Sequence, residues 1–275
     1  MKKFLYILLG ILIFIFMVLM YSRFIGTTSL KVIEKTINTN INESFNGLKI
    51  VHFSDIHFKK IITEERVSEV IDNINNTYPD LIIFTGDLLD SMYVTTSSDV
   101  SFLIEMLSKL ESKYGKYAVM GDNDYKDREI INNIYIQNEF LLLNNNSTII
   151  YSKNNDKINL VGLGSNISKD FNIDNTNIDT NNYTIILMHE PDMIDKVLEK
   201  YPNTSLILSG HSINGSINIP LLKKGLLPDG AKKYYKPYYK INNTDIYISN
   251  GIGVNNINFR LFNSPSFNLY RLKRS

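Results

Sequence analysis

Apolar residues follow the chain in short runs separated by polar segments, after one much longer run at the start. Residues 4–21, FLYILLGILIFIFMVLMY, contain no charged residue. A helix of this length spans about 27 Å, close to the thickness of the hydrocarbon core of a bilayer. Because the run has no polar face, it predicts a transmembrane helix rather than a buried core helix.

The residues that flank this run predict its orientation. Lys2, Lys3 and the amino terminus precede it, and Arg23 alone follows it closely. Positive charge collects on the cytoplasmic side, so we expect the amino terminus inside and the rest of the chain outside. The alternative is a cleaved signal peptide, but no small-x-small cleavage site follows and the run is longer than a usual signal-peptide core. We therefore expect residues 1–26 to be an uncleaved single-pass anchor in the cell membrane, with an extracytoplasmic domain.

Beyond the anchor, residues 27–46 are expected to form a polar connector and residues 47–275 a single domain. This domain alternates short apolar runs with helical patterns, which is typical of an α/β or layered α-β fold. The asparagine-rich stretch 165–182 is predicted to be a surface loop. The expected strands are 48–53, 81–86, 117–121, 158–163, 183–189, 205–210, 245–249 and 267–272. The expected helices are 62–76, 98–112 and 191–200.

Composition narrows the chemistry of this domain. The 275 residues include 29 basic and 28 acidic side chains, a net charge of +1, so we expect no nucleic-acid partner. The absence of cysteine excludes disulfides, thiolate metal sites and cysteine nucleophiles. Any metal must therefore be held by His, Asp, Asn and water. The four histidines are His52, His57, His189 and His211.

Residues that can bind metals collect where the predicted strands end. Ligands bind at the carboxyl ends of strands in layered sheets, so such side chains could converge on one rim. A single His or Asp after a strand is more often a loop cap, but donors at five successive strand ends make a coincidence less plausible. The candidates are Asp55 and His57 in HFSDIH, Asp87 in FTGDLLD, Asp122, Asn123 and Asp124 in VMGDND, His189 in LMHEPD, and His211 in LSGHS.

Local spacing supports convergence. The period-two spacing of Asp55 and His57 directs both side chains to one face of an extended segment. A glycine precedes Asp87, Asp122 and His211, so the backbone can turn sharply there. Carboxylate, imidazole and amide oxygen donors suit Mn, Fe or Zn. Two such ions about 3.5–4 Å apart, bridged by one carboxylate, would activate a water for attack on a phosphoryl group.

In these motifs the sequence resembles the calcineurin-like metallophosphoesterases, and among them the membrane-anchored bacterial branch. The family signature is D-x-H, G-D, G-N-H-[DE], H and G-H-x-H at successive strand ends. The similarity runs from about Leu48 to Leu272 and includes the segments GHSINGSINIP and YISNGIGVNNINFRLFNSP. The resemblance implies a four-layer α-β-β-α sandwich that hydrolyses a phosphoester or pyrophosphate with two divalent ions.

The resemblance also implies roles for individual residues. His52 has no role in the motif, and we expect it to be a packed histidine. Asp87 would bridge the ions and orient the attacking hydroxide, and Asn123 would face the substrate, so both are candidate catalytic residues. The implied metal ligands are Asp55, His57 and Asp87 for the first ion and Asp87, Asp122, His189 and His211 for the second.

The motif GDND departs from the family signature at two residues. Asp122 stands where the family has an Asn ligand, and it keeps an oxygen donor while adding negative charge. Asn123 stands where the family has a His that protonates the leaving group. An Asn can donate a hydrogen bond to a phosphate oxygen but delivers no proton, and loss of a general acid typically costs about 10²–10⁴-fold in rate.

The motif GHSI departs as well. Ile213 replaces the second His of G-H-x-H, which is a ligand of the first ion in the family. An aliphatic side chain cannot bind a metal, so the first ion would depend on its three remaining ligands unless Ser212, Asn214 or water substitutes. The first site is therefore predicted to be depleted, with one ion or two bound.

Three hypotheses for function follow. The retained ligands favour a metal-dependent phosphoesterase or pyrophosphatase at the membrane surface, whose substrate could be lipid-linked. Asn123 and Ile213 favour the alternative, a pseudoenzyme that acts as a membrane-tethered binding or scaffold protein. A weaker hypothesis is lipid or cell-surface binding through KKYYKPYYK, residues 232–240, where a solvated hairpin is the ordinary interpretation. We favour the enzyme because five ligand positions remain together.

Overall fold

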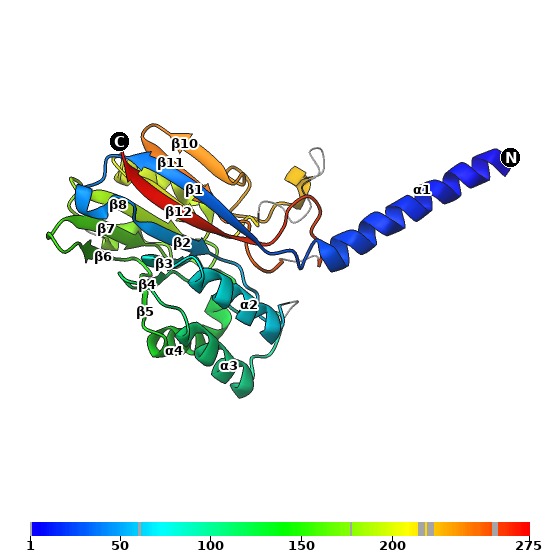
Figure 1. Cartoon of the computed structure of the whole chain (residues 1–275), viewed down its shortest axis with the longest axis horizontal. Helices are drawn as coiled ribbons and strands as arrows, with labels where there is room; N and C mark the ends of the chain where they lie inside the picture. Colours follow the sequence, from blue (N-terminus) through cyan, green and yellow to red (C-terminus); the bar gives the residue numbers. More distant parts are fainter. Residues whose placement is uncertain (1, 60–61, 177, 214–217, 219–222, 255–257) are drawn as a thin grey trace.

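Two mixed β-sheets lie face to face in the computed structural model of the chain (Figure 1). The structure describes all residues except 1, 60–61, 177, 214–217, 219–222 and 255–257. In spatial order, the first sheet contains β1 (Lys31–Thr39), β12 (Ser266–Arg274), β2 (Lys49–Phe53), β3 (Leu81–Phe84), β4 (Lys116–Ala118) and β5 (Phe140–Leu142). The second contains β10 (Tyr238–Ile241), β11 (Thr244–Ile248), β9 (Leu206–Ser209), β8 (Tyr183–Met188), β7 (Lys157–Gly162) and β6 (Asn146–Tyr151).

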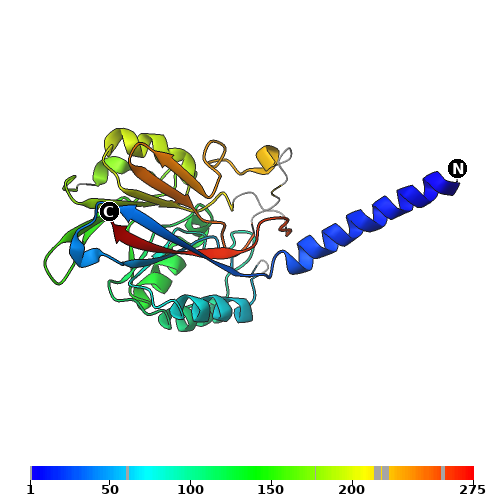
Figure 2. The same ribbon diagram turned by 45° about the horizontal axis from the view of Figure 1, so that its top comes forward.

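Helices cover the outer face of each sheet, as Figure 2 shows. Those on the first sheet are α2 (Glu64–Asn75), α3 (Ser97–Ser108) and α4 (Arg128–Gln137). The second sheet is covered by α5 (Ile194–Lys200). The short helical turns are η2 (Glu43–Phe45), η3 (Asn123–Asp127), η4 (Ile173–Asn175), η5 (Pro191–Met193) and η6 (Lys223–Leu226).

Three hydrophobic clusters hold these layers together. One lies between the first sheet and its helices, one between the two sheets, and one between the second sheet and α5. Strand β8 shows the pattern, because Ile185 and Leu187 pack between the sheets while Ile186 and Met188 pack toward α5. The predicted four-layer α-β-β-α sandwich is thereby confirmed.

The segment expected to be a polar connector contains a regular strand. Strand β1 pairs with β12 over its whole length, from Lys31 opposite Ser266 to Thr39 opposite Arg274. It lies at the edge of the first sheet, and of its residues only Ile37 is fully buried. An edge strand needs no continuous apolar run, which is why hydrophobic pattern alone did not predict it.

Other elements also lacked a strong apolar signal. Strands β6 and β10 are edge strands, and β5 has only 3 residues. Helix α4 was missed although Ile130, Ile131, Ile134 and Tyr135 fall at helical spacing within it. Among its described residues, the stretch 165–182 contains no strand and only the short turn η4, in agreement with the predicted loop.

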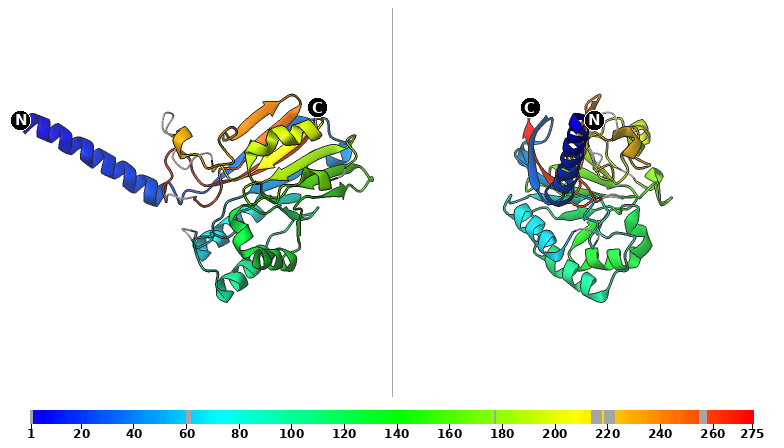
Figure 3. Two further views of the ribbon diagram at one scale, coloured as in Figure 1. Left: turned by 180° about the vertical axis from the view of Figure 1, so that it is seen from behind. Right: turned by 90° about the vertical axis from the view of Figure 1, so that its right-hand side faces the viewer.

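The amino-terminal helix projects away from the domain (Figures 1 and 3). It consists of α1 (Lys2–Met20) and the π-helical turn η1 (Tyr21–Ile25), and α1 buries none of its residues. The segment Lys2–Ile25 is long and apolar enough to cross a membrane. Strand β1 follows it and runs parallel to β12 and therefore antiparallel to β2. The helix consequently joins the domain at the end of the first sheet where β2 terminates.

Candidate metal centre

The candidate ligands lie in the loops that follow β2, β3, β4, β8 and β9, where the two sheets meet at one end. Four of them adopt the left-handed backbone region that non-glycine residues rarely occupy: Asp55 (φ 51°), His57 (φ 47°), Asp87 (φ 61°) and His211 (φ 64°). Such strain persists only where the surroundings enforce it, and it typically marks functional sites. Each strand end is turned so that its side chain points to a common centre.

The first group contains Asp55, His57 and Asp87. The His57 Nε2 atom lies 3.3 Å from Asp87 Oδ2 and 4.0 Å from Asp55 Oδ1. All three side chains are almost completely buried. Two buried carboxylates with oxygen atoms within 4.8 Å of each other repel, and either a positive charge between them or protonation of one relieves that repulsion.

The second group shares Asp87 with the first and adds Asp122, His189 and His211. The His189 Nε2 atom lies 3.3 Å from both Asp87 Oδ2 and Asp122 Oδ1. The His211 Nδ1 atom lies 3.2 Å from Asp122 Oδ1 and 3.2 Å from His189 Nε2. Asp87 thus stands between the two groups, where a bridging ligand belongs.

The unsatisfied atoms of the two groups fit a metal centre. Within each group the possible ligand atoms all lie within 4.8 Å of one another. His57 Nε2 and Asp122 Oδ1 are buried, and neither makes a well-aligned hydrogen bond among the described residues. Buried polar atoms without partners are rare outside functional sites, and coordination of a divalent cation would satisfy both.

Electrostatics lead to the same conclusion. Burial raises the pKa of Asp55, and the charge of Asp87 raises it further. Burial lowers the pKa of His189, but the charge of Asp87 and hydrogen bonding to Asp122 and Asp87 outweigh burial and hold that pKa well above its usual range. The ionised carboxylates are therefore stabilised by nearby positive charge. Bound divalent ions would supply this positive charge while the imidazoles stay neutral.

Two glycines allow the strands to approach this closely. A Cβ on Gly86 would stand 2.2 Å from the Gly121 nitrogen, and a Cβ on Gly121 would stand 2.1 Å from Asp87 Oδ1. Gly86 also has a φ of 90°. Any side chain at either position would displace Asp87.

The three histidines are oriented by partners on their other ring nitrogen. The His189 Nδ1 atom lies 2.6 Å from the Thr85 carbonyl oxygen, and the His211 Nε2 atom lies 2.6 Å from that of Asp229. These contacts leave the opposite nitrogen of each ring directed to the candidate ligand group. The His57 Nδ1 atom lies 3.4 Å from the buried Asp90 carboxylate. Asp90, the last residue of FTGDLLD, was not singled out from the sequence because nothing local showed that it would face His57.

Asp124 fixes the backbone of the loops that carry the candidate ligands. Its carboxylate accepts hydrogen bonds from the backbone nitrogens of Asp87, Leu88 and Gly121, each at 2.9 Å. The side chain is completely buried. Sequence analysis placed Asp124 at a strand end without a role, and the contacts show that it fixes the loop that carries Asp87.

Asn123 contacts the bridging carboxylate. Its backbone nitrogen donates to Asp87 Oδ1 at 3.0 Å, and its Nδ2 donates to Asp87 Oδ2 at 2.8 Å. The Ser91 hydroxyl donates to Asn123 Oδ1 at 2.6 Å, which fixes the orientation of the amide. The side chain thus lies beside Asp87, between the candidate ligands and Ser91.

Ile213 lies beside the first group. It is 1% exposed and has a φ of 46°, an uncommon value for a β-branched residue. Among the possible substitute ligands, Ser212 is buried and its hydroxyl lies 3.5 Å from the Tyr235 carbonyl oxygen. Asn214 lies outside the described residues.

His52 remains apart from both groups. Its Nε2 lies 2.9 Å from the Thr85 hydroxyl, its Nδ1 lies 3.5 Å from the Tyr270 hydroxyl, and burial lowers its pKa to about 3. A neutral, completely buried imidazole between the sheets agrees with the expected packing role.

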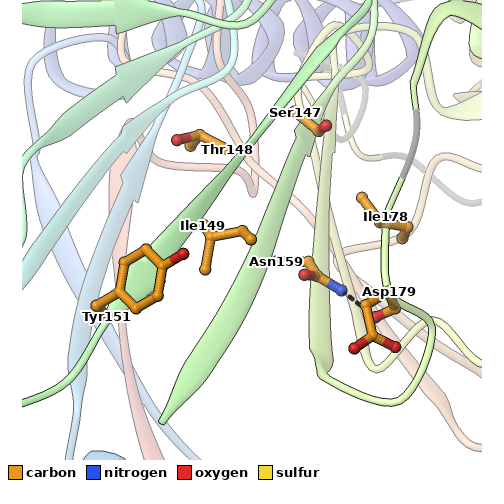
Figure 4. Close-up of a pocket in the computed structure, with 7 residues that line it drawn as sticks. All are labelled: Ser147, Thr148, Ile149, Tyr151, Asn159, Ile178 and Asp179. Atoms are coloured by element: carbon orange, nitrogen blue, oxygen red, sulfur yellow. Dashed lines mark hydrogen bonds between the residues drawn. The ribbon is translucent and has the colours of Figure 1, made fainter. Parts of the chain in front are cut away.

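A separate surface pocket lies on β6 and β7 (Figure 4). Asn159 Nδ2 donates to the Asp179 carbonyl oxygen there at 2.7 Å. The pocket is lined by Ser147, Thr148, Ile149, Tyr151, Asn159, Ile178 and Asp179. Its described lining residues include none of the candidate ligands and a single carboxylate, so they offer no metal site.

The chain is similar in sequence to known metallophosphoesterases. The family model for calcineurin-like phosphoesterases matches residues 48–249. The chain is 29% identical over 258 residues to the uncharacterized metallophosphoesterase YkuE of Bacillus subtilis, covering 92% of this chain and 89% of that protein. It is 27% identical over 238 residues to the UDP-2,3-diacylglucosamine pyrophosphatase LpxG of Chlamydia trachomatis, covering 67% of this chain and 70% of LpxG.

A longer protein and a solved structure are also similar to the chain. A transmembrane protein with metallophosphoesterase domain from Danio rerio is 25% identical over 241 residues, which cover 80% of this chain and 52% of that protein. The crystal structure of the calcineurin-like phosphoesterase YfkN from Bacillus subtilis aligns with a TM-score of 0.44 and 13% identity, covering 76% of this chain and 82% of YfkN.

Proposed function

The chain belongs to the calcineurin-like phosphoesterase family, and we propose that it is a metal-dependent phosphoesterase or pyrophosphatase that acts at the membrane surface. The observation that carries the proposal is the pair of ligand groups joined by Asp87, in which every side chain except the partly exposed Asp122 is buried. Asp55, His57 and Asp87 would hold the first divalent ion, and Asp87, Asp122, His189 and His211 the second. The donor set suits Mn, Fe or Zn.

Bound ions would supply an activated water and neutralise the charge of the phosphoryl group. The chain itself contributes positioning. Asp87, held by Gly121 and Asp124, keeps the two ligand groups together. Asn123, oriented by Ser91, can donate from Nδ2 to a phosphate oxygen. Because its amide supplies no proton, the leaving group must depart without help from this residue.

The anchor helix supports a substrate at the membrane surface. The helix joins the domain at the same edge as the metal centre, so a substrate in the bilayer would be within reach. LpxG, the similar protein from Chlamydia, is named for a diacylated nucleotide-sugar diphosphate, which supports a lipid-linked pyrophosphate as the substrate. Lys2 and Lys3 before the helix favour a single pass through the cell membrane with an extracytoplasmic domain.

The contacts of residues 232–240 weaken the hypothesis that this segment binds lipid. Lys233 pairs with Asp195 at 2.7 Å, and Lys240 pairs with Asp245 at 2.8 Å. The end of the strip lies in the hairpin of β10 and β11. Lysines that already have carboxylate partners are weaker attractants for anionic lipids.

The second candidate function is a membrane-tethered binding or scaffold protein of the same fold. Asn123 cannot act as a general acid, and Ile213 has no atom that can bind a metal. Both departures from the family signature would lower activity and therefore favour this candidate. The six potential ligand side chains, five of which match the family signature, favour the enzyme.

The test uses the full chain in detergent micelles. Bound metal is counted by elemental analysis, and hydrolysis of a phosphodiester with an activated leaving group is measured in Mn²⁺. Asp87→Ala should abolish both metal binding and turnover, while Asp174→Asn, which changes an 85% exposed carboxylate, should leave both unchanged. Turnover that is equal in the wild type and Asp87→Ala would exclude the enzyme and leave the scaffold.

A further inference from the structure

The foot of the anchor helix is packed against a loop of the catalytic domain. The Arg260 backbone nitrogen donates to the Ser22 carbonyl oxygen at 3.0 Å, and a Cβ on Gly26 would stand 2.0 Å from the Arg260 carbonyl oxygen. Ser22 and Thr27 are buried in this contact region. The helix therefore has a fixed attachment to the domain rather than a free linker.

The same loop reaches the metal centre. The Arg260 guanidinium is buried and donates to the carbonyl oxygens of Asn250 at 2.8 Å and Gly251 at 3.0 Å. The next glycine, Gly253, donates from its nitrogen to the carbonyl oxygen of Asp55 at 2.6 Å. The chain of contacts from the helix to a candidate metal ligand is thus short and consists of buried groups.

A second segment joins this rim. Asn218 donates from its backbone nitrogen to the Leu261 carbonyl oxygen at 3.0 Å, and the Asn263 amide donates to the Ile213 carbonyl oxygen at 2.5 Å. The turn η6 follows this segment. In Figures 1 and 2, the loop around residues 258–265 lies beside the foot of α1, and η6 projects from the same end of the domain, farther from the helix.

Large apolar side chains are exposed at this place. Phe262 is 77% exposed and Leu226 46%, and the helix foot adds Phe24 at 59% and Ile25 at 54%. Phe262 also has a φ of 57°. An exposed bulky residue gains nothing from contact with water, and the place of Phe262, in the loop that packs against the foot of a helix suited to span a bilayer, points to a membrane partner.

We propose that Phe262 and Leu226 insert into the interfacial region of the bilayer beside the anchor, as a second membrane contact that holds the metal centre at the level of the lipid head groups. The inference rests on the membrane anchoring in the proposed function. The occupant is the lipid bilayer because Phe262 lies in the loop that packs against the foot of a helix that is itself suited to span it, and Leu226 is exposed at the same end of the domain. Aromatic and aliphatic side chains at this depth bind the interface by burying apolar area.

The chain contains no tryptophan, so one introduced tryptophan reports on its own position. The full chain is reconstituted into phosphatidylcholine vesicles whose acyl chains are brominated close to the head group, and quenching of tryptophan emission is measured. The test variant is Phe262→Trp. The matched control is Tyr78→Trp, because Tyr78 is 78% exposed, has a φ of 51° and lies just before β3, at the end of the strands opposite the ligands. Phe14→Trp reports whether the anchor helix is in the bilayer.

Quenching of Phe262→Trp and Phe14→Trp, with Tyr78→Trp unquenched and open to iodide, is the expected result. Quenching of Phe14→Trp alone would overturn the second contact and leave the anchor intact. Without quenching of Phe14→Trp, the anchor is wrong and the second contact falls with it. The readout needs no turnover, so a failure of the phosphoesterase assignment would not affect it.

Discussion

Replacing Ile213 by His tests whether the first metal site is depleted. Ile213 is 1% exposed with a φ of 46°, and a β-branched residue in this region costs about 1–2 kcal/mol. His adopts the left-handed region more readily. The position that a Cβ of Gly251 would occupy lies 3.0 Å from Asp55 Cβ and 3.4 Å from Ile213 Cγ1, so the side chain of Ile213 lies close to Asp55.

The expected magnitude follows from these contacts. Loss of the buried Ile side chain costs about 1.5–3 kcal/mol, and relief of backbone strain offsets part of it. The metal-free variant should therefore unfold with a free energy within about 2 kcal/mol of the wild type. An added imidazole should increase the affinity for the first ion by at least about 10–100-fold. This is the loss of affinity seen when a residue that only orients a ligand is removed. That factor corresponds to about 1.4–2.7 kcal/mol.

The assay is a Mn²⁺ titration of the full chain in detergent, with bound metal measured by elemental analysis and the unfolding midpoint recorded at each concentration. Ile213→Asn is the control, because Asn also suits the left-handed region but offers only a weak amide oxygen. We expect Ile213→His to bind two ions at concentrations where the wild type and Ile213→Asn bind fewer. Equal metal content in all three proteins across the titration would refute the reasoning.

Two further predictions concern the centre as a whole. Gly121→Ala should abolish metal binding, because its Cβ would stand 2.1 Å from Asp87 Oδ1, whereas Gly225→Ala has no atom within 4 Å of its Cβ and should bind metal normally in the same elemental analysis. Chelation should lower the unfolding midpoint by about 5–10 °C if the ions were present at about 100 times their dissociation constant, as measured by scanning calorimetry. Asp87→Ala should show no such shift, and a shift of equal size in that variant would contradict the assignment of the ligands.

The layers could be predicted from sequence because the central strands and α2 bury almost every apolar residue. Strand β3, for example, is buried along its whole length. The edge strands could not, because β1 has only Ile37 fully buried and its pairing with β12 joins segments from opposite ends of the chain. Hydrophobic pattern reports burial, and an edge strand is formed by backbone pairing with little burial.

The candidate ligands could be identified because each follows a strand and has chemistry that a surface turn does not require. The supporting residues could not. Asp90 and Asp124 are ordinary acidic residues in sequence, and only the fold shows that one faces His57 and the other binds three backbone nitrogens. Arg260 gave no signal because its partners are carbonyl oxygens in a loop.

The presence of Asn at position 123 predicts which leaving groups the enzyme can release. Its contacts with Asp87 are intact at 2.8 and 3.0 Å, so what this position lacks is proton donation rather than geometry. A phosphate leaving group has a second pKa of about 6 and departs from a pyrophosphate near pH 7 without a proton. An alkoxide is far more basic and depends on a general acid, whose absence costs about 10²–10⁴-fold.

The wild-type chain should therefore hydrolyse a pyrophosphate diester much faster than an alkyl phosphodiester, and Asn123→His should narrow the gap by accelerating the alkyl substrate. Both substrates are compared at the same pH and Mn²⁺ concentration by phosphorus NMR. Asn123→Gln is the control, because it keeps an amide and adds no titratable group. If Asn123→His accelerated both substrates equally, the residue would act on binding or metal occupancy, and the restored imidazole would not be serving as an acid.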